Sequence, residues 1–130
     1  MTAFAADAPD GRQGVALLGS TGSIGTSALR VLARQRERFR VVALTAHTSA
    51  GVLAAQAAET GARFVGLVHP EPGHAVPDDW RTGPAALVEA ATCPGADVVL
   101  NAVVGAAGLR ATLAALGAGR RVALANKESL

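Results

Sequence analysis

The sequence predicts an α/β fold in which a mostly parallel sheet carries helices on both faces. Short apolar runs alternate along the chain with segments whose apolar residues recur at helical spacing. Most of these runs are continuously apolar instead of alternating with polar residues, as strands buried on both faces require. Because 50% of the 130 residues are apolar but only 3% are aromatic, we expect a closely packed core of Ala, Val and Leu.

This alternation places five strands and four helices in the chain. The expected strands are Val15–Leu18, Val41–Ala46, Phe64–Val68, Val98–Val104 and Val122–Ala125. The expected helices are Ser27–Leu32, Ala50–Thr60, Pro84–Ala91 and Ala106–Ala118. Short connections between strand and helix favour right-handed crossovers and a parallel sheet, so the predicted architecture is Rossmann-like.

Helical spacing also assigns one face to each of the longer helices. These faces comprise Ile24, Ala28, Val31, Leu32 and Gln35 in the first helix, Leu53, Ala57 and Thr60 in the second, and Leu109, Leu113 and Leu116 in the last. Gly61 and Gly119 are expected to end the second and the last helix. The proline-containing segment His69–Gly83 is expected to be an exposed loop that Trp80 anchors by packing.

The turn after the first strand carries the most specific pattern in the chain, Gly19-Ser20-Thr21-Gly22-Ser23-Ile24-Gly25. A glycine-rich turn between a strand and a helix leaves backbone N–H groups pointing outward at the positive end of the helix dipole, which suits phosphate. Its G-x-x-G-x-x-G spacing is a variant of the dinucleotide fingerprint, and Ser20, Thr21 and Ser23 offer hydroxyls as further donors. The alternative is an ordinary capped turn, but such a turn rarely needs three glycines at three-residue spacing.

A second polar segment, His47–Ser49, follows the second strand. NAD-selective sites usually place a carboxylate here to bind the ribose 2′-hydroxyl, and this chain has none. His47 and the hydroxyls of Thr48 and Ser49 can instead accommodate a 2′-phosphate, so the segment favours NADPH as the cofactor. A polar helix cap at Thr48 or Ser49 is an alternative that is compatible with this role.

Composition and patterning argue against several other classes of protein. A net charge of +2 is too small to suggest nucleic acid as the main partner, and no apolar segment approaches the length of a membrane span. The single cysteine, Cys93, cannot form an internal disulfide and is interpreted as an inert loop thiol of a cytoplasmic protein. His69 and His74 have no third ligand nearby, which favours solvent-facing positions over a metal site. Residues 1–13 lack a secretory pattern and are expected to be a flexible leader to a cofactor-binding domain at 14–130.

Two further segments reach the same predicted edge of the sheet. They are Asn101–Leu109 and Leu124–Leu130, of which the second reads Leu-Ala-Asn-Lys-Glu-Ser-Leu. In their order and spacing, the glycine turn and these two segments resemble the N-terminal NADPH-binding domain of the 1-deoxy-D-xylulose-5-phosphate reductoisomerase family. The resemblance runs from Gly14 to the last residue, and the final segment is highly specific to that family.

The resemblance implies an NADPH-dependent enzyme of non-mevalonate isoprenoid biosynthesis. Such an enzyme rearranges and reduces 1-deoxy-D-xylulose 5-phosphate to 2-C-methyl-D-erythritol 4-phosphate, with Mg²⁺ or Mn²⁺ as the Lewis acid. Motif matching assigns the cofactor phosphates to Thr21, Gly22, Ser23 and Ile24, the reactive end of the cofactor to Asn126 and Glu128, and the phosphorylated substrate to Lys127. The resemblance places the catalytic metal ligands, the lid and the substrate-phosphate site beyond this chain. It therefore implies a chain that is inactive alone and a homodimer for the full-length enzyme.

Two other interpretations of the residues stay open. The chain can be the cofactor domain of another two-domain NADP-dependent reductase, although Asn126-Lys127-Glu128 is not expected in the semialdehyde dehydrogenases of that kind. It can also be a non-catalytic NADP-sensing module. A short-chain-type dehydrogenase is disfavoured, because that chemistry normally needs a Tyr acid and the chain has no Tyr.

Overall fold

A single sheet organises the molecule. The structure, a computed structural model of the chain, describes residues 11–125. Within these residues six parallel strands form one sheet in the order β4-β3-β2-β1-β5-β6. The strands are β1 (Gln13–Leu18), β2 (Phe39–Ala46), β3 (Phe64–Leu67), β4 (Arg81–Thr82), β5 (Val98–Asn101) and β6 (Arg121–Leu124). The helices are α2 (Ser23–Arg34), α3 (Ala50–Thr60), α4 (Ala85–Ala91) and α5 (Gly105–Gly117).

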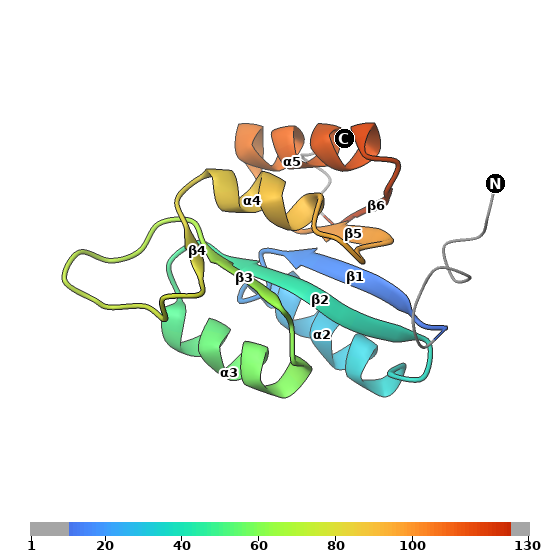
Figure 1. Cartoon of the computed structure of the whole chain (residues 1–130), viewed down its shortest axis with the longest axis horizontal. Helices are drawn as coiled ribbons and strands as arrows, with labels where there is room; N and C mark the ends of the chain where they lie inside the picture. The colour runs from blue at the N-terminus through green and yellow to red at the C-terminus, as the bar shows by residue number, and fades with distance from the viewer. Residues whose placement is uncertain (1–10, 126–130) are drawn as a thin grey trace.

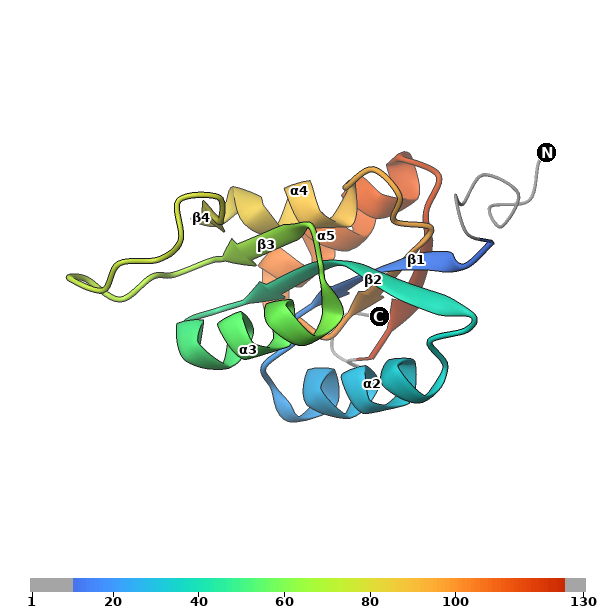
Figure 2. The same ribbon diagram turned by 60° about the horizontal axis from the view of Figure 1, so that its bottom comes forward.

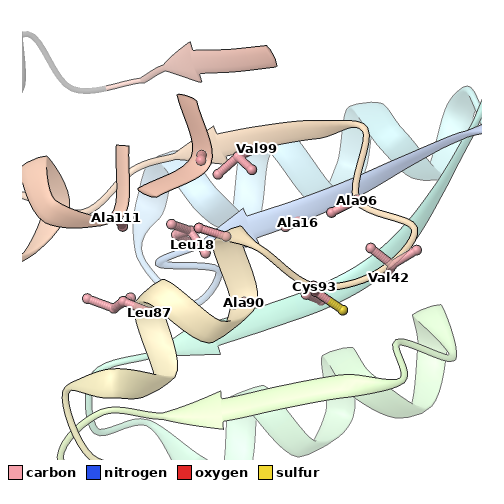
Figure 3. Packing of buried hydrophobic residues seen from close by; sticks show 12 residues of the cluster. Ala16, Leu18, Val42, Leu87, Ala90, Cys93, Ala96, Val99 and Ala111 are labelled. Carbon is pink, nitrogen blue, oxygen red and sulfur yellow. The ribbon is translucent and has the colours of Figure 1, made fainter. Parts of the chain in front are cut away.

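Helices cover both faces of the sheet, with α2 and α3 on one side and α4 and α5 on the other (Figure 1). Successive side chains of a strand point to opposite faces, so Leu17 packs in the layer under α2 and α3 while Leu18 packs under α4 and α5. Figure 3 shows the second layer, which consists of Ala, Val and Leu side chains together with Cys93. The predicted Rossmann-like fold is confirmed. Between residues 11 and 125, no helix is long and apolar enough to cross a membrane.

The direction of the chain across the sheet reverses at β1. From β1 the chain runs outward through β2, β3 and β4, and it then crosses to the other side of β1 to form β5 and β6. In open parallel sheets, ligands bind in the crevice that such a reversal leaves at the carboxyl ends of the central strands. The ends of β1, β2 and β5 are therefore where a ligand site is expected.

The five expected strands are present, and two differences from the expectation have local causes. β5 ends at Asn101 and not at Val104, because the Asn101 side chain accepts a hydrogen bond from the N–H of Val103 and turns the chain. The two-residue strand β4 lies inside the segment that the sequence predicts to be a loop, and it pairs with Gly66 and Leu67 of β3. Neither Arg81 nor Thr82 belongs to an apolar run, so hydrophobicity gives no signal for this edge strand.

Most of the segment between β3 and β4 is exposed, as expected, and it projects beyond the sheet (Figure 2). Trp80, which immediately precedes β4, is partly buried against the layer under α2 and α3. Its indole therefore anchors the loop, as the sequence predicts. The helix stops are also found, since Gly61 and Gly119 adopt left-handed conformations with φ of 69° and 78° after α3 and α5.

The expected face of α3 is confirmed, since Leu53 is buried and Ala57 packs beside it, but the faces of α2 and α5 correct the sequence interpretation. In α5 the expected leucine face is the exposed one, with Leu113 59% and Leu116 55% exposed, and the helix packs instead through Gly108, Ala111, Thr112 and Ala115. In α2, Ala28 and Leu29 pack against the sheet whereas Ile24, Val31 and Gln35 are exposed. Small residues let α5 approach closely: a Cβ added at Gly108 would collide with the carbonyl of Val103.

Candidate dinucleotide-binding site

The glycine turn between β1 and α2 is fixed to the end of β2. Gly19 has a φ of 81°, a conformation that favours glycine. Its N–H donates to the carbonyl oxygen of Thr45 at 3.1 Å, and the N–H of Ser20 donates to the same oxygen at 2.8 Å. Thr45 Oγ1 lies 3.2 Å from the N–H nitrogen of Gly19 and accepts a further bond. These bonds hold the turn in one conformation, but they also use the N–H groups of Gly19 and Ser20.

The start of α2 leaves other N–H groups available. Gly22 is the N-cap residue, and no side chain among the described residues caps this helix. The first turn contains no acidic residue, and the first helical hydrogen bond runs from the N–H of Thr26 to the carbonyl of Gly22 at 2.8 Å. The exposed residues Ser23 and Ile24 therefore present backbone N–H groups at the positive end of the helix dipole. This arrangement suits an anionic group such as phosphate.

Two glycines of the turn have different structural roles. A Cβ added at Gly25 would lie 2.7 Å from Ser20 Cα and would also collide with the carbonyl of Gly19, so only glycine lets α2 start this close to the turn. A Cβ at Gly22 would meet no atom nearer than the Gly19 oxygen at 3.8 Å. The space beside Gly22 is open, exposed and bordered by backbone, which is what a pyrophosphate approaching the chain requires.

Of the three hydroxyls expected to bind phosphate, one is not available for it. Ser20 is fully buried, and its hydroxyl donates to Gln56 Oε1 at 2.6 Å. The side-chain amide of Gln56 donates back to the carbonyl of Ser20 at 2.9 Å. Ser20 is thus a structural residue, which corrects the expectation. The hydroxyls of Thr21 and Ser23 make no hydrogen bond within residues 11–125 and remain accessible to a ligand.

A cavity of about 480 Å³ opens where β1, β2 and β5 end. Its lining residues are Gly19, Thr21, Gly22, Thr45, Ala46, His47, Val68, Leu87, Ala102, Val103, Val104 and Ala107. Of the sequence-predicted site residues, Thr21, Gly22 and His47 share this cavity, while Ser23 and Ile24 follow Gly22 at the start of α2. The apolar side chains in this lining can pack against a flat ring, and the glycine turn at one end of the cavity can bind phosphate.

Thr48 and Ser49 lie on a second cavity, of about 260 Å³, which also includes Glu71 and His74. These two hydroxyl residues therefore line a different cavity from the adjacent His47. Ser49 occupies the N-cap position of α3, but its side chain makes no capping hydrogen bond within the described residues. The hydroxyl of Ser49 is exposed and the capping alternative does not occupy it.

The turn after β5 is held by one buried side chain. Asn101 donates from Nδ2 to the carbonyl of Gly108 and to Thr112 Oγ1, both at 2.8 Å. Its Oδ1 accepts the N–H of Val103 at 3.0 Å. The segment that lines the cavity opposite the glycine turn is therefore fixed to α5. This segment lies close to the turn, since a Cβ added at Gly19 would be 3.4 Å from the backbone of Ala102.

Comparison with known proteins identifies one family to which this chain is similar. The family model of 1-deoxy-D-xylulose 5-phosphate reductoisomerase matches residues 15–130. The chain belongs to this family. The 1-deoxy-D-xylulose 5-phosphate reductoisomerase of Mycolicibacterium smegmatis is 53% identical over 131 residues, which cover 100% of the chain and 33% of the relative. The enzyme of Bordetella pertussis is 50% identical over 127 residues, covering 91% and 32%. The chain thus spans about a third of the length of these relatives.

Solved structures of reductoisomerases share the fold. The enzyme from Zymomonas mobilis in complex with NADPH matches with a TM-score of 0.79 and 43% identity, covering 92% of this chain and 33% of that one. A crystal structure of a reductoisomerase with NADPH, fosmidomycin and magnesium matches with a TM-score of 0.76 and 39% identity, covering 91% and 31%. The resemblance read from the three motifs is therefore confirmed at the level of family and fold.

Three reductoisomerase motif residues, Asn126, Lys127 and Glu128, lie outside the described residues, as do residues 1–10 of the expected leader. Within residues 11–125, no three His, Cys, Asp or Glu side chains lie close enough together to hold a metal ion. Sequence reasoning missed Thr45 and Gln56, which hold the glycine turn. The sequence held one indication of this role: both are polar residues at positions where the surrounding apolar pattern of a strand or a helix predicts burial.

The single thiol stands apart from this site. Cys93 is buried in the connection that leads into the amino end of β5, at the opposite edge of the sheet from the glycine turn. Burial raises the pKa of the Cys93 thiol above its ordinary value, and the positive charges of Arg63, Arg120 and Arg40 only partly oppose this shift. Cys93 is therefore expected to remain protonated and unreactive, in agreement with its interpretation as an inert thiol.

Proposed function

We propose that this chain is the NADPH-binding part of a 1-deoxy-D-xylulose 5-phosphate reductoisomerase. The whole enzyme converts 1-deoxy-D-xylulose 5-phosphate to 2-C-methyl-D-erythritol 4-phosphate in non-mevalonate isoprenoid biosynthesis. The observation that carries the proposal is the uncapped start of α2 beside an open glycine at the carboxyl edge of β1. NADPH in a relative 43% identical over 92% of this chain supports the same cofactor here.

The residues at the site fit a dinucleotide in shape and charge. The N–H groups of Ser23 and Ile24, with the hydroxyl of Thr21, would bind the pyrophosphate, and the absence of a side chain at Gly22 admits it. Among residues 11–125, no Asp or Glu lines the cavity that contains His47, so none of these residues repels a 2′-phosphate there. Bound NADPH supplies a hydride for the reduction; the contribution of this part of the chain is to bind and orient the cofactor.

The rest of the reaction is assigned to the remaining two thirds of the family's sequence. In this proposal those residues supply the carboxylate ligands of a divalent metal, Mg²⁺ or Mn²⁺, together with the lid and the substrate-phosphate site. Magnesium in a solved relative supports the metal assignment. Lys127 would contact the phosphorylated substrate, and Asn126 and Glu128 the reactive end of the cofactor. A cytoplasmic homodimer is the proposed form of the full-length enzyme, and residues 14–130 its cofactor domain.

Titration of the purified chain with NADPH and NADH tests the cofactor assignment, with nicotinamide fluorescence and calorimetry as readouts. We expect saturable binding and a preference for NADPH. Gly22→Asp should abolish binding, since its carboxylate would occupy the open space and repel the pyrophosphate. Gly117→Asp is the matched control, because Gly117 is exposed in the last turn of α5 and a Cβ there meets no atom within 4 Å.

Circular dichroism and urea unfolding of each variant separate loss of the site from loss of the fold. A folded wild-type chain that binds neither dinucleotide would contradict the proposed cofactor role of residues 14–130. Equal effects of Gly22→Asp and Gly117→Asp would contradict the location of the site. Turnover of 1-deoxy-D-xylulose 5-phosphate by the chain alone would contradict the assignment of the metal and substrate residues to the rest of the enzyme.

A further inference from the structure

His47 and His69 stack on one another at the carboxyl edge of the sheet. Their ring centroids are 5.6 Å apart and their ring planes differ by 15°. The N–H of His69 donates to the carbonyl of His47 at 2.8 Å, and the N–H of Val68 donates to the carbonyl of Ala46 at 2.9 Å. These bonds continue the pairing of β2 and β3 beyond the last residues of both strands. The parallel register of the sheet therefore fixes the two histidines side by side.

The histidine stack borders the candidate cofactor site. His47 and Val68 line the same cavity as Gly22 of the glycine turn. The carbonyl that anchors this turn belongs to Thr45, only two residues before His47 along the chain. In sheets of this topology the adenosine ribose lies beyond the end of the second strand, which is β2 here. A 2′-phosphate on that ribose would reach the edge where the stack lies.

The surroundings of the stack favour an anion. Both histidines are exposed, and neither ring donates a hydrogen bond to another group within residues 11–125. In the part of the chain that the structure describes, no Asp or Glu lines the cavity. The carboxylate of Glu71 lines the neighbouring cavity and lies 3.8 Å from the ring of the third histidine, His74. Two imidazole rings at the cofactor edge are thus left without an acceptor among the described residues.

We propose that His69, together with His47, forms the receptor for the 2′-phosphate of NADPH; the inference rests on the proposed cofactor role. A neutral imidazole carries one N–H and an imidazolium carries two, so each ring has a donor for a phosphate oxygen in either state. Hydrogen bonds to an ionised acceptor are the stronger class. Stacking also restricts the rotation of the His47 ring, so that less side-chain entropy is lost when the phosphate binds. The pair replaces the Arg that commonly accommodates this phosphate.

Three variants of the whole chain separate donation from packing. His69→Ala removes both the donor and the stack, and His69→Phe keeps a flat ring but has no N–H. His74→Ala is the matched control, because His74 is exposed and lies on the neighbouring cavity. Each is titrated with NADPH and with NADH, which differ only in the 2′-phosphate. We expect both His69 variants to weaken NADPH binding about tenfold, the effect of losing one hydrogen bond to a charged group. NADH affinity should change less than about twofold, and His74→Ala should change neither.

The three histidines also provide a direct readout, since no others occur in the sequence. Imidazole NMR signals, assigned with these variants and His47→Phe, should shift for His47 and His69 on addition of adenosine 2′,5′-bisphosphate and stay constant for His74. Full NADPH preference in His69→Phe would overturn the donor role, and equal losses of NADPH and NADH affinity would reduce His69 to a packing residue. A folded wild-type chain that binds neither dinucleotide would instead overturn the cofactor role itself and this inference with it.

Discussion

Ser20 and Gln56 exchange two hydrogen bonds in the interior of the protein. The Ser20 hydroxyl donates to Gln56 Oε1 at 2.6 Å, and Gln56 Nε2 donates to the Ser20 carbonyl at 2.9 Å. The two residues are 0% and 7% exposed, so water does not compete for these groups. The pair joins the glycine turn to α3, the helix that follows His47–Ser49. It therefore fixes the two segments of the candidate cofactor site relative to each other.

Gln56→Met is expected to lower the free energy of unfolding by about 1–3 kcal/mol. Methionine has a similar volume but no hydrogen-bonding amide, so the Ser20 hydroxyl and carbonyl would be buried without partners. NADPH binding should weaken as well, because the turn would be less rigidly held. Urea unfolding and NADPH titration measure the two effects. The matched control is Gln35→Met at an exposed position, where we expect a change within about 0.5 kcal/mol. Equal stability of the two variants would contradict the structural role of the pair.

Gly22→Ala and Gly25→Ala are expected to differ strongly in their effect on stability. The Gly25 methyl group would collide with backbone atoms of Gly19 and Ser20, which cannot move without displacing the turn, so a loss of about 2 kcal/mol or more is expected. At Gly22 the φ of −73° suits alanine and the space is open. Stability there should change by less than about 1 kcal/mol, since the lower entropy of the unfolded chain is offset by the poorer fit of alanine to the N-cap position. Thermal unfolding of the two variants checks this, and a stable Gly25→Ala protein would contradict the close approach of α2.

The order of strands and helices is largely predictable from this sequence, whereas helix faces are predictable in α3 but not in α2 or α5. Short continuous runs such as Val15–Leu18, which lies between two glycines, favour a strand covered on both sides. In α5, however, leucines and alanines both recur at helical spacing, and hydropathy favours the leucines. In the structure α5 instead packs its alanines and glycine against the sheet, because small side chains let the helix approach closely. Which face packs therefore depends on the distance between the helix layer and the sheet. That distance is a property of the tertiary structure.

The position of the candidate cofactor site is also predictable, because the glycine turn and the strand order determine which strand ends meet there. The roles of individual polar residues are less so. Ser20 and Thr21 are adjacent hydroxyl residues in the same turn, yet one is fully buried with Gln56 and the other lines the cavity. His69 lies twenty-two residues from His47 in the sequence and meets it only through the pairing of β2 with β3. Contacts of this kind follow from the register of the sheet.

Ala111→Lys and Leu113→Lys test which face of α5 is packed. Ala111 is 0% exposed in the layer above the sheet, so a lysine there would be forced into a space without room for it or its charge. We expect a loss above about 3 kcal/mol or failure to fold. Leu113 is 59% exposed, and its lysine variant should keep its stability within about 0.5 kcal/mol. Leu113→Lys should also reduce self-association, because it interrupts an exposed apolar stripe. Urea unfolding and sedimentation velocity measure both properties, and the reverse order of stabilities would support the leucine face as the packed one.

The Cys93 thiol is expected to react slowly with iodoacetamide in the folded chain and rapidly in urea. Burial raises its pKa, so the nucleophilic thiolate is scarce at neutral pH, and the side chain is only 5% exposed. Mass spectrometry of the alkylated chain gives the two rates directly, because no other cysteine is present. Equal rates in buffer and in urea would contradict the buried position.

The raised pKa of Cys93 also makes the free energy of unfolding depend on pH in the alkaline range. The ordinary thiol pKa of about 8.5 applies to the unfolded chain, while the folded chain keeps the proton to a higher pH. Between the two pKa values the unfolded state binds fewer protons, so the free energy of unfolding must fall as pH rises, by at most about 1.4 kcal/mol per pH unit. Cys93→Ala lacks this titration. Its stability should therefore decline less than that of the wild type between pH 8 and pH 10, and since the chain contains no Tyr, few other groups titrate in this range. Parallel curves for the two proteins in urea unfolding would show that the thiol is not protected from ionisation by the fold.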